Sequence, residues 1–132
     1  MTDANAPIVL LVGHCFPDAM MLKSAVKRVI KGVNFEKAHS VGDLEKHLPG
    51  SSVALVNRVL DGSFESTDGI GLIRQFASHE AGTALLLVSN FPESQAEAEA
   101  AGAAPGFGKT DLYAAETAER ILAAIAISTT GA

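Results

Sequence analysis

Three apolar runs stand out in the pattern of hydrophobic and polar positions along the chain, at residues 8–12, 52–60 and 83–88. None of them alternates regularly between apolar and polar residues, as a strand with one exposed face would. Such runs are typical of strands buried on both faces, like the inner strands of a parallel sheet. The middle run lies between turn-forming pairs at 49–50 and 61–62, and it predicts a central strand that should end at Asn57.

Two weaker strands and several helices complete the pattern. Residues 33–39 alternate only partly and predict a strand nearer an edge, and a last short strand is expected around residues 107–109. Between the strands, apolar residues recur at helical spacing. They predict helices over residues 17–31, 42–48, 69–79, 94–102 and 111–127.

Strands that alternate with helices in this way predict an α/β fold with a five-stranded parallel sheet and helices on both faces. Right-handed crossovers favour the strand order 2-1-3-4-5, the order of flavodoxin-like folds. Residues 1–132 are expected to form one domain, with flexible ends at 1–7 and 128–132.

Composition and charge exclude several classes of function. The formal net charge is −5, which argues against a nucleic-acid surface because phosphate contacts need clustered Lys and Arg. The first residues lack the pattern of a signal peptide, and no apolar run is long enough to span a bilayer. A single cysteine, Cys15, allows no internal disulfide and suits a reducing compartment, so the expected location is cytoplasmic.

Several short motifs place polar residues directly after predicted strands. Residues 53–57 followed by Leu60 form a buried strand that ends in a polar residue, and Asp68-Gly69 then opens a helix. Another buried strand leads into Ser89, and Lys109 follows the last strand. Together these motifs resemble a response-regulator receiver domain of the CheY-like family over nearly the whole chain. The resemblance implies that Asn57 stands at the phosphoacceptor aspartate, Ser89 at the switch hydroxyl and Lys109 at the family's lysine.

The chain departs from that family at the residues of the phosphorylation site. The family has two acidic residues after the first strand, which hold Mg²⁺ together with the phosphoacceptor. Here the matching positions are His14 and Cys15, or Gly13 and His14 if the register shifts by one. The position of the aromatic switch residue is occupied by Gly106, with Phe107 beside it.

These departures predict a pseudo-receiver. An amide at position 57 cannot form an acyl phosphate, and Mg²⁺ usually needs carboxylate ligands. We therefore expect no enzymatic activity, no metal and no cofactor, and an interaction module of bacterial signal transduction that works without phosphorylation. The expected partner is a signalling protein or a second copy of the chain, with no nucleic acid and no membrane.

The resemblance also implies where a partner would bind. In the family the fourth helix, the fifth strand and the fifth helix form the usual partner and dimer face. On this chain that face would include Glu97, Phe107, Tyr113 and Glu116.

Two other classes of function stay open. The chain could be an active phosphoreceiver with an unconventional acceptor, such as Asp61 or His14. It could also bind a nucleotide, because residues 103–110 fit a loose Walker A pattern, although the expected context of strand, loop and helix is missing. A flavin site is disfavoured, because residues 13–17 lack a phosphate loop rich in glycine and hydroxyl groups.

Each candidate residue also has a structural interpretation. Asn57 could bond to nearby backbone, Ser89 could be an ordinary strand-end hydroxyl, and Cys15 could be a small buried apolar residue. His14 is expected in a packed or half-exposed loop rather than in a metal pair with Cys15.

The lysine and the glycine-rich segment before it carry one expectation each. We expect the Lys109 ammonium to reach Asn57 Oδ1 or a backbone carbonyl, because a buried ammonium without partners is costly. Residues 105–108 are expected to form a mobile loop with Phe107 partly exposed.

Overall fold

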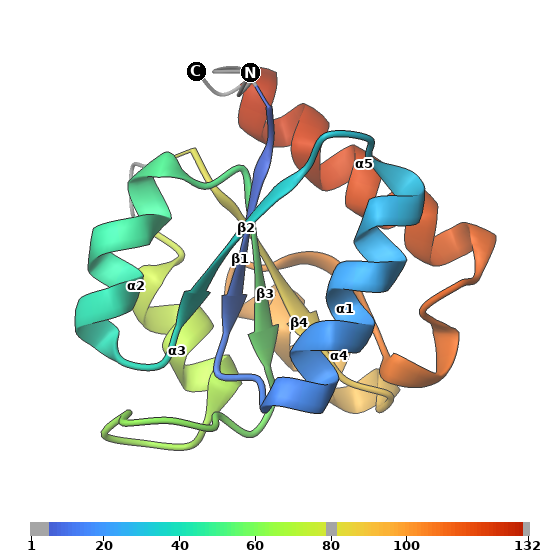
Figure 1. Ribbon diagram of the computed structural model, residues 1–132. Helices are drawn as coiled ribbons and strands as arrows, with labels where there is room; N and C mark the ends of the chain where they lie inside the picture. Colours follow the sequence, from blue (N-terminus) through green and yellow to red (C-terminus); the bar gives the residue numbers. More distant parts are fainter. Residues whose placement is uncertain (1–5, 79–81, 131–132) are drawn as a thin grey trace.

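Five parallel strands form a single sheet in the order β2-β1-β3-β4-β5, as predicted (Figure 1). This is a computed structural model, which describes residues 6–78 and 82–130 and, for 128–130, the backbone alone. The strands are β1 (Ile8–Val12), β2 (Asn34–Ala38), β3 (Val53–Asn57), β4 (Ala84–Val88) and β5 (Ala104–Phe107).

Helices cover both faces of this sheet (Figure 1). Helices α1 and α5 pack on one face, and α2, α3 and α4 pack on the other. The helices are α1 (Phe16–Val29), α2 (Val41–His47), α3 (Gly69–Phe76), α4 (Pro92–Ala100) and α5 (Ala115–Thr130). Two short 3₁₀ helices, η1 (Leu48–Gly50) and η2 (Lys109–Asp111), follow α2 and β5. No helix in the described ranges has the length and apolarity that crossing a membrane requires.

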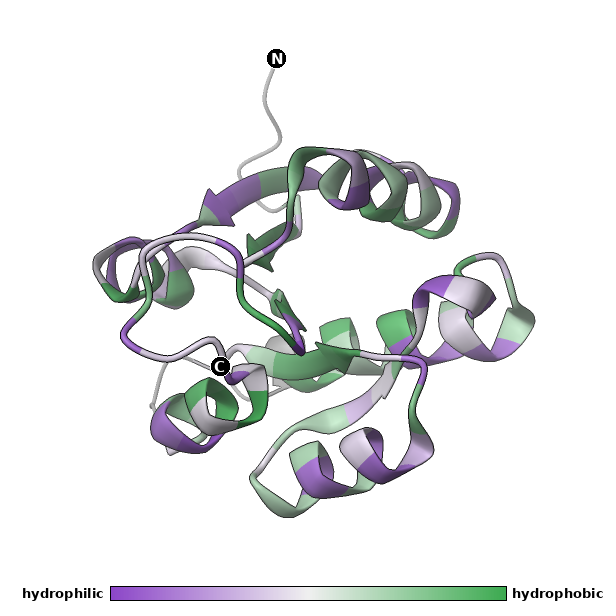
Figure 2. Cartoon of the chain, turned by 90° about the horizontal axis from the view of Figure 1, so that it is seen from below, coloured by the Kyte–Doolittle hydropathy of each residue, from purple (hydrophilic) through white to green (hydrophobic). Residues whose placement is uncertain are grey.

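The core explains why the inner strands lack an alternating pattern. Successive residues of a strand point to opposite faces of the sheet. In β1, Val9 and Leu11 pack under α1 and α5, whereas Leu10 and Val12 pack under the helices of the other face. Both sets are buried, so the strand must be apolar at every position. Figure 2 shows the apolar inner strands between two layers of helices that carry both polar and apolar residues.

The helix starts follow from local chemistry. Pro17 and Asp18 lie in the first turn of α1, where a missing N–H is tolerated and a carboxylate meets the positive helix end. Ser40 Oγ accepts a hydrogen bond of 3.1 Å from Asp43 N at the start of α2. Asp68 Oδ1 accepts one of 3.1 Å from Ile70 N at the start of α3.

Some predicted boundaries are wrong. The central strand ends at Asn57, as predicted, whereas the last strand covers residues 104–107 rather than 107–109. Helix α5 begins at Ala115, because η2 and the turn after it occupy residues 109–114. The same helix continues to Thr130, so residues 128–130 are not a frayed tail. The predicted end of the third helix, near residue 79, lies outside the described residues.

The amino end of the described chain is also tied down. Pro7 O accepts a hydrogen bond of 2.9 Å from Asn34 N, which holds Pro7 beside the start of β2. Residues 1–5 lie outside the described part of the chain.

The long connection between β3 and α3 is folded back onto the end of β2. Gly62, with φ of +128°, lies against the His39 carbonyl, where any added Cβ would lie 2.5 Å from the oxygen. Ser63 N donates to that same carbonyl at 2.7 Å. The loop, α2 and α3 enclose a surface hollow of about 520 Å³.

Candidate functional site

Three of the predicted site residues meet at the carboxyl edge of the sheet. Asn57 ends β3, Ser89 follows β4, and Lys109 follows β5. Together with the side chains around them they line a hollow of about 250 Å³. Figure 2 views the molecule from this edge. The other residues that line the hollow are Arg58, Val59, Val88, Asn90 and Phe91.

The Lys109 ammonium is hydrogen-bonded to the Asp18 carboxylate, not to Asn57 or to a backbone carbonyl as the sequence led us to expect. Asp18 lies in the first turn of α1, which brings its carboxylate to the same edge of the sheet. A carboxylate is a stronger partner for an ammonium than a neutral amide is. The bond to Lys109 is the main reason that the pKa of Asp18 is lowered.

Asn57 has a structural bond of its own. Its Nδ2 donates a hydrogen bond of 3.0 Å to Gly13 O, in the loop that follows β1. Gly13 O also accepts from Asp61 N at 2.9 Å, so the end of β3 is held to the end of β1. An ionised aspartate could not donate this bond. The Asn57 amide therefore bonds to backbone, but to a carbonyl 44 residues away in the sequence rather than within its own loop.

His14 is buried beneath the site, with 2% of its surface exposed. Its Nε2 lies 2.7 Å from Leu55 O, and because a carbonyl only accepts, the ring N–H donates. Burial lowers the pKa of His14 to about 4, so the ring is neutral at neutral pH. A neutral imidazole brings no negative charge to the position where the receiver family has an acid.

Cys15 is half-buried rather than buried, so the expectation of a small core residue is wrong. It stands at the N-cap of α1, and its side chain helps to lower the pKa of the Asp18 carboxyl, after the larger effect of Lys109.

Ser89 makes a local bond at the end of β4. It is buried, and its Oγ accepts a hydrogen bond of 3.2 Å from Phe91 N. This is the arrangement expected for a strand-end hydroxyl that shapes the following turn.

Gly106, at the family's aromatic position, has no room for a side chain. A Cβ there would lie 2.2 Å from Leu87 O and 2.8 Å from Gln95 Oε1. The Gln95 amide fills this space and donates hydrogen bonds to Leu87 O at 2.9 Å and Ser89 O at 3.1 Å.

The four residues of the predicted interaction face do not all lie on one surface. Glu97 and Glu116 are exposed, on α4 and α5. Tyr113 is 59% exposed but lies toward α1, with Arg28 4.8 Å from its ring centroid. Phe107 is wrongly included, because it is 3% exposed and packs in the core under α5.

The segment over residues 105–108 is not the mobile loop that the glycines suggested, since residues 105–107 belong to β5. Gly108 is packed against Asn90, where an added Cβ would lie 2.0 Å from Oδ1. A phosphate-binding loop needs backbone amides gathered at a helix start. Lys109 begins the short helix η2, and α5 begins only at Ala115, so the Walker-like pattern lacks that context.

The sequence did not predict which side chains surround Asn57, Ser89 and Lys109 at the hollow. Arg58 Nε donates a hydrogen bond of 2.9 Å to Ser94 Oγ of α4, and the guanidinium lies 5.9 Å from the ring centroid of Phe91. The signal was present for Arg58, because it directly follows Asn57 at a strand end. Nothing in the sequence pointed to Gln95.

The residues present do not fit the Mg²⁺ ion of a receiver site. The Asp18 carboxylate is engaged by Lys109, and the Asn57 amide is neutral. Within the described ranges, no group of three or more His, Cys, Asp or Glu side chains is arranged to hold a metal ion.

Solved structures with this fold share little sequence with the chain. The signal receiver domain of a DNA-binding response regulator from Colwellia psychrerythraea is 16% identical with a TM-score of 0.68, and the match covers 92% of this chain and 99% of that chain. A response regulator from Thermotoga maritima is 19% identical with a TM-score of 0.69, covering 92% and 98%. A CheY-like receiver domain protein from Methanospirillum hungatei is 18% identical with a TM-score of 0.65, covering 97% and 100%.

Comparison with models of protein families finds no match, and comparison with curated proteins finds none. The solved structures and the strand order nevertheless show that the chain has the fold of response-regulator receiver domains. The predicted fold class is confirmed.

Proposed function

We propose that this chain is a receiver-like domain of bacterial two-component signalling that acts as a non-catalytic protein-interaction module in the cytoplasm. It works without taking up phosphate. The observation that carries the proposal is the hydrogen bond from Asn57 Nδ2 to Gly13 O. The side chain at the acceptor position is a neutral amide that serves the fold.

The charge balance of the site supports the same conclusion. Phosphoryl transfer needs a nucleophile and positive charge that is available to the phosphoryl oxygens. Lys109 is the cation at this edge in the receiver family, and here it is paired with Asp18. Asp18 comes from within α1 rather than from the positions directly after β1. The charges of Lys109 and Asp18 therefore balance each other.

The alternative acceptors are poorly placed. His14 is 2% exposed, which keeps a phosphodonor away from its ring. Asp61 is exposed but does not line the hollow that contains Lys109. Neither residue combines access with a nearby cation, so the interaction module is the better supported function.

A Mg²⁺ titration followed by NMR tests this proposal. We expect no saturable shifts in the amides of residues 13–18, 57–59 and 89 at millimolar Mg²⁺, because no acidic pair is available there. The same titration with Ca²⁺ shows whether any small change is general screening. Saturable shifts confined to these residues, seen with Mg²⁺, would contradict the proposal.

A further inference from the structure

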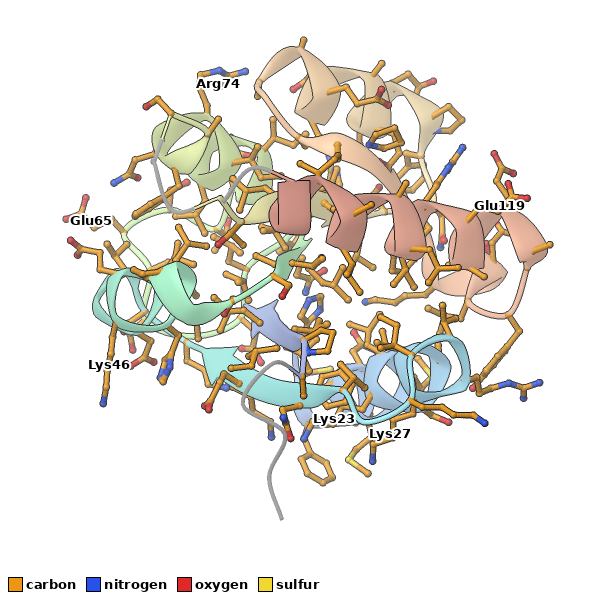
Figure 3. All side chains as sticks on the ribbon, turned by 90° about the horizontal axis from the view of Figure 1, so that it is seen from above. Lys23, Lys27, Lys46, Glu65, Arg74 and Glu119 are labelled. Carbon is orange, nitrogen blue, oxygen red and sulfur yellow. The ribbon has the colours of Figure 1, made fainter. Side chains whose placement is uncertain are left out.

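The basic side chains of the protein gather around one edge of the sheet. Residues 16–37 carry five of the ten basic residues but only two of the fifteen acidic ones. Of these two acids, Asp18 is bound to Lys109, and Glu36 Oε2 lies 3.9 Å from His47 Nδ1. Figure 3 shows Lys23 and Lys27 of α1 on the side of the molecule where β2 lies, and Glu119 of α5 on a different side. The five basic residues are Lys23, Lys27, Arg28, Lys31 and Lys37.

Strand β2 forms this edge and has open backbone groups on its outer side. Its only neighbour in the sheet is β1. Asn34 N donates a hydrogen bond of 2.9 Å to Pro7 O, so the backbone of Asn34 is directed toward β1. Alternate residues of a strand direct their backbone groups to opposite sides, so those of Phe35 and Lys37 point away from the sheet. Within the described ranges, neither residue has a backbone hydrogen bond on that outer side.

The long connection between β3 and α3 covers only the end of this edge. Ser63 N donates to His39 O at 2.7 Å, and His39 N donates to Asp43 Oδ2 at 3.0 Å. The outward groups of His39 are therefore satisfied by the chain itself. The open backbone groups of Phe35 and Lys37 lie just before that point along the strand.

An exposed stripe of α1 lies beside the open backbone groups. Phe16, Met20 and Lys23 follow one another at intervals of four and three residues, so they lie on one side of the helix. Phe16 is 68% exposed and Met20 is 48% exposed. Lys37 Nζ lies 5.6 Å from the ring centroid of Phe16. Lys23 Nζ lies 5.9 Å from that of Phe35, so the stripe adjoins β2. We call these five side chains, with the outer backbone of β2, the β2 edge surface.

The opposite edge of the sheet is closed to strand addition. There β5 is four residues long and contains Pro105, and its Gly106 O accepts a hydrogen bond of 2.6 Å from Arg120 Nη1. Short length, proline and occupied backbone groups are features by which natural edges are closed. β2 has five residues and contains neither proline nor glycine.

Three other occupants fit the β2 edge surface poorly. A second copy of the chain would bring two lysine-rich surfaces together, and charges on an edge, here Glu36 and Lys37, oppose pairing of an edge with itself. A lipid surface would leave the open N–H and C=O groups without partners. Nucleic-acid phosphates accept hydrogen bonds but offer no donor to the open carbonyls.

We propose that the β2 edge surface binds an extended, acidic segment of another protein, which adds to the sheet as a strand beside β2. Main-chain hydrogen bonds to Phe35 and Lys37 hold the segment in place. On the α1 side, its Asp or Glu residues meet Lys23 and Lys37. Its apolar side chains pack against Phe16 and Met20. The inference rests on the proposed function and names the chemistry of the partner.

The test uses a peptide with the repeat Glu-Thr-Val-Thr, which places acidic and apolar side chains on one face of a strand. It is titrated into the isotope-labelled chain and followed by NMR. We expect saturable shifts in α1 and β2, and slower hydrogen exchange at the amides of Phe35 and Lys37, because both become hydrogen-bonded. The Glu36 amide, which faces β1, should not change in exchange. The counterpart peptide with Lys in place of Glu should not bind.

Methylation of the peptide backbone separates strand addition from the attraction of opposite charges. Two peptides are compared, each methylated on a different set of alternate backbone nitrogens. Only one set faces β2 in the added strand, so only one of the two peptides should lose binding, by about tenfold or more. Both peptides carry the same charge, and the chain itself is unaltered.

Two substitutions at one position make the same distinction on the chain. Lys37→Gln removes only the charge and should weaken binding by about threefold. Lys37→Pro also removes the outward N–H, which an edge strand tolerates, and should weaken binding by about a further tenfold. Lys46→Gln, at an exposed position of α2, should change binding by less than about twofold. Circular dichroism checks that each variant is folded.

Three results would overturn the inference: no binding of the Glu peptide, equal binding of the two methylated peptides, or binding of the chain to phosphatidylserine vesicles or to a DNA duplex that Lys37→Gln weakens. None of them bears on phosphate uptake. Conversely, saturable Mg²⁺ binding at the site would refute the proposed function whether or not the peptide binds.

Discussion

Single residues at the carboxyl edge of the sheet make structural bonds within the fold. Asn57 holds the end of β1, His14 donates to the β3 backbone, and the Lys109 ammonium is bound to Asp18. Asn57 Nδ2, His14 Nε2 and Lys109 Nζ each have a partner within the fold. Phosphate or metal would have to displace bonds that the folded chain already makes.

The pH dependence of stability should report the burial of His14. Its pKa is about 4 in the folded chain, against 6.5 for a histidine in water, so the unfolded chain binds the proton more tightly. The contribution of the neutral ring to the free energy of unfolding is therefore fully present above pH 6.5. It is lost as the pH falls toward 4, by up to about 3 kcal/mol. Urea unfolding measured at intervals of pH checks this.

A histidine pair provides the control for that measurement. His14→Gln keeps an N–H donor for Leu55 O but cannot titrate, so the loss of stability between pH 6.5 and 4 should disappear. His39→Gln, at an exposed position, should leave the loss in place. The lowered pKa values of Asp18 and Asp43 act at lower pH, below about 3.8. If His14→Gln and the unaltered chain lose stability equally, the burial argument fails.

The sequence predicted which residues meet at the site but not how they bond. Parallel strands end at one edge, so the positions of Asn57, Ser89 and Lys109 after successive strands were enough to bring them together. The Lys109 partner was missed because Asp18 reaches the site from inside α1. The pattern of the strands does not predict where a side chain in the first turn of a helix lies.

At the level of elements, the contact between β4 and β5 is the least regular part of the sheet. Leu86 pairs with Ala104 and Val88 with Phe107, so β5 has one residue more than β4 between the two pairs. This bulge brings Gly106 against Leu87, and the amide of Gln95 satisfies the Leu87 carbonyl. An element held in this way has no space for a moving aromatic side chain.

Gly106→Ala should therefore be strongly destabilising, because an added Cβ would lie 2.2 Å from a backbone oxygen. We expect a loss of about 2 kcal/mol or more in the free energy of unfolding, measured by urea denaturation. Gly50→Ala is the matched control, since no atom lies within 4 Å of its Cβ position, and it should change stability by less than about 0.5 kcal/mol. Equal effects of the two changes would refute the bulge account.

The bulge also explains which elements the sequence misplaced. The inner strands β1, β3 and β4 were located from their apolar runs, because burial on both faces leaves a signal in every residue. β5 contains a proline and a glycine, which are typical of turns, and its strand conformation depends on contacts with β4 and α4. Local pattern carries no information on such contacts, so the strand was placed three residues late.

The whole molecule combines a closed carboxyl edge with an acidic outer surface. The carboxyl edge is held by internal bonds, and the acidic side chains of α4 and α5 are exposed. If the edge does not respond to phosphate, the interaction surface is set by folding alone. Partner binding should then be the same with and without a phosphodonor.

Intact-mass spectrometry after incubation with acetyl phosphate and Mg²⁺ tests the central claim most directly. Neither the unaltered chain nor Asn57→Asp should gain the mass of a phosphoryl group, because Asn57→Asp alone still lacks the acidic pair. Asn57→Asp combined with His14→Asp and Cys15→Asp has the best prospect of a gain, provided that circular dichroism shows it folded. A Mg²⁺-dependent phosphoryl mass gain on the unaltered chain would contradict the account.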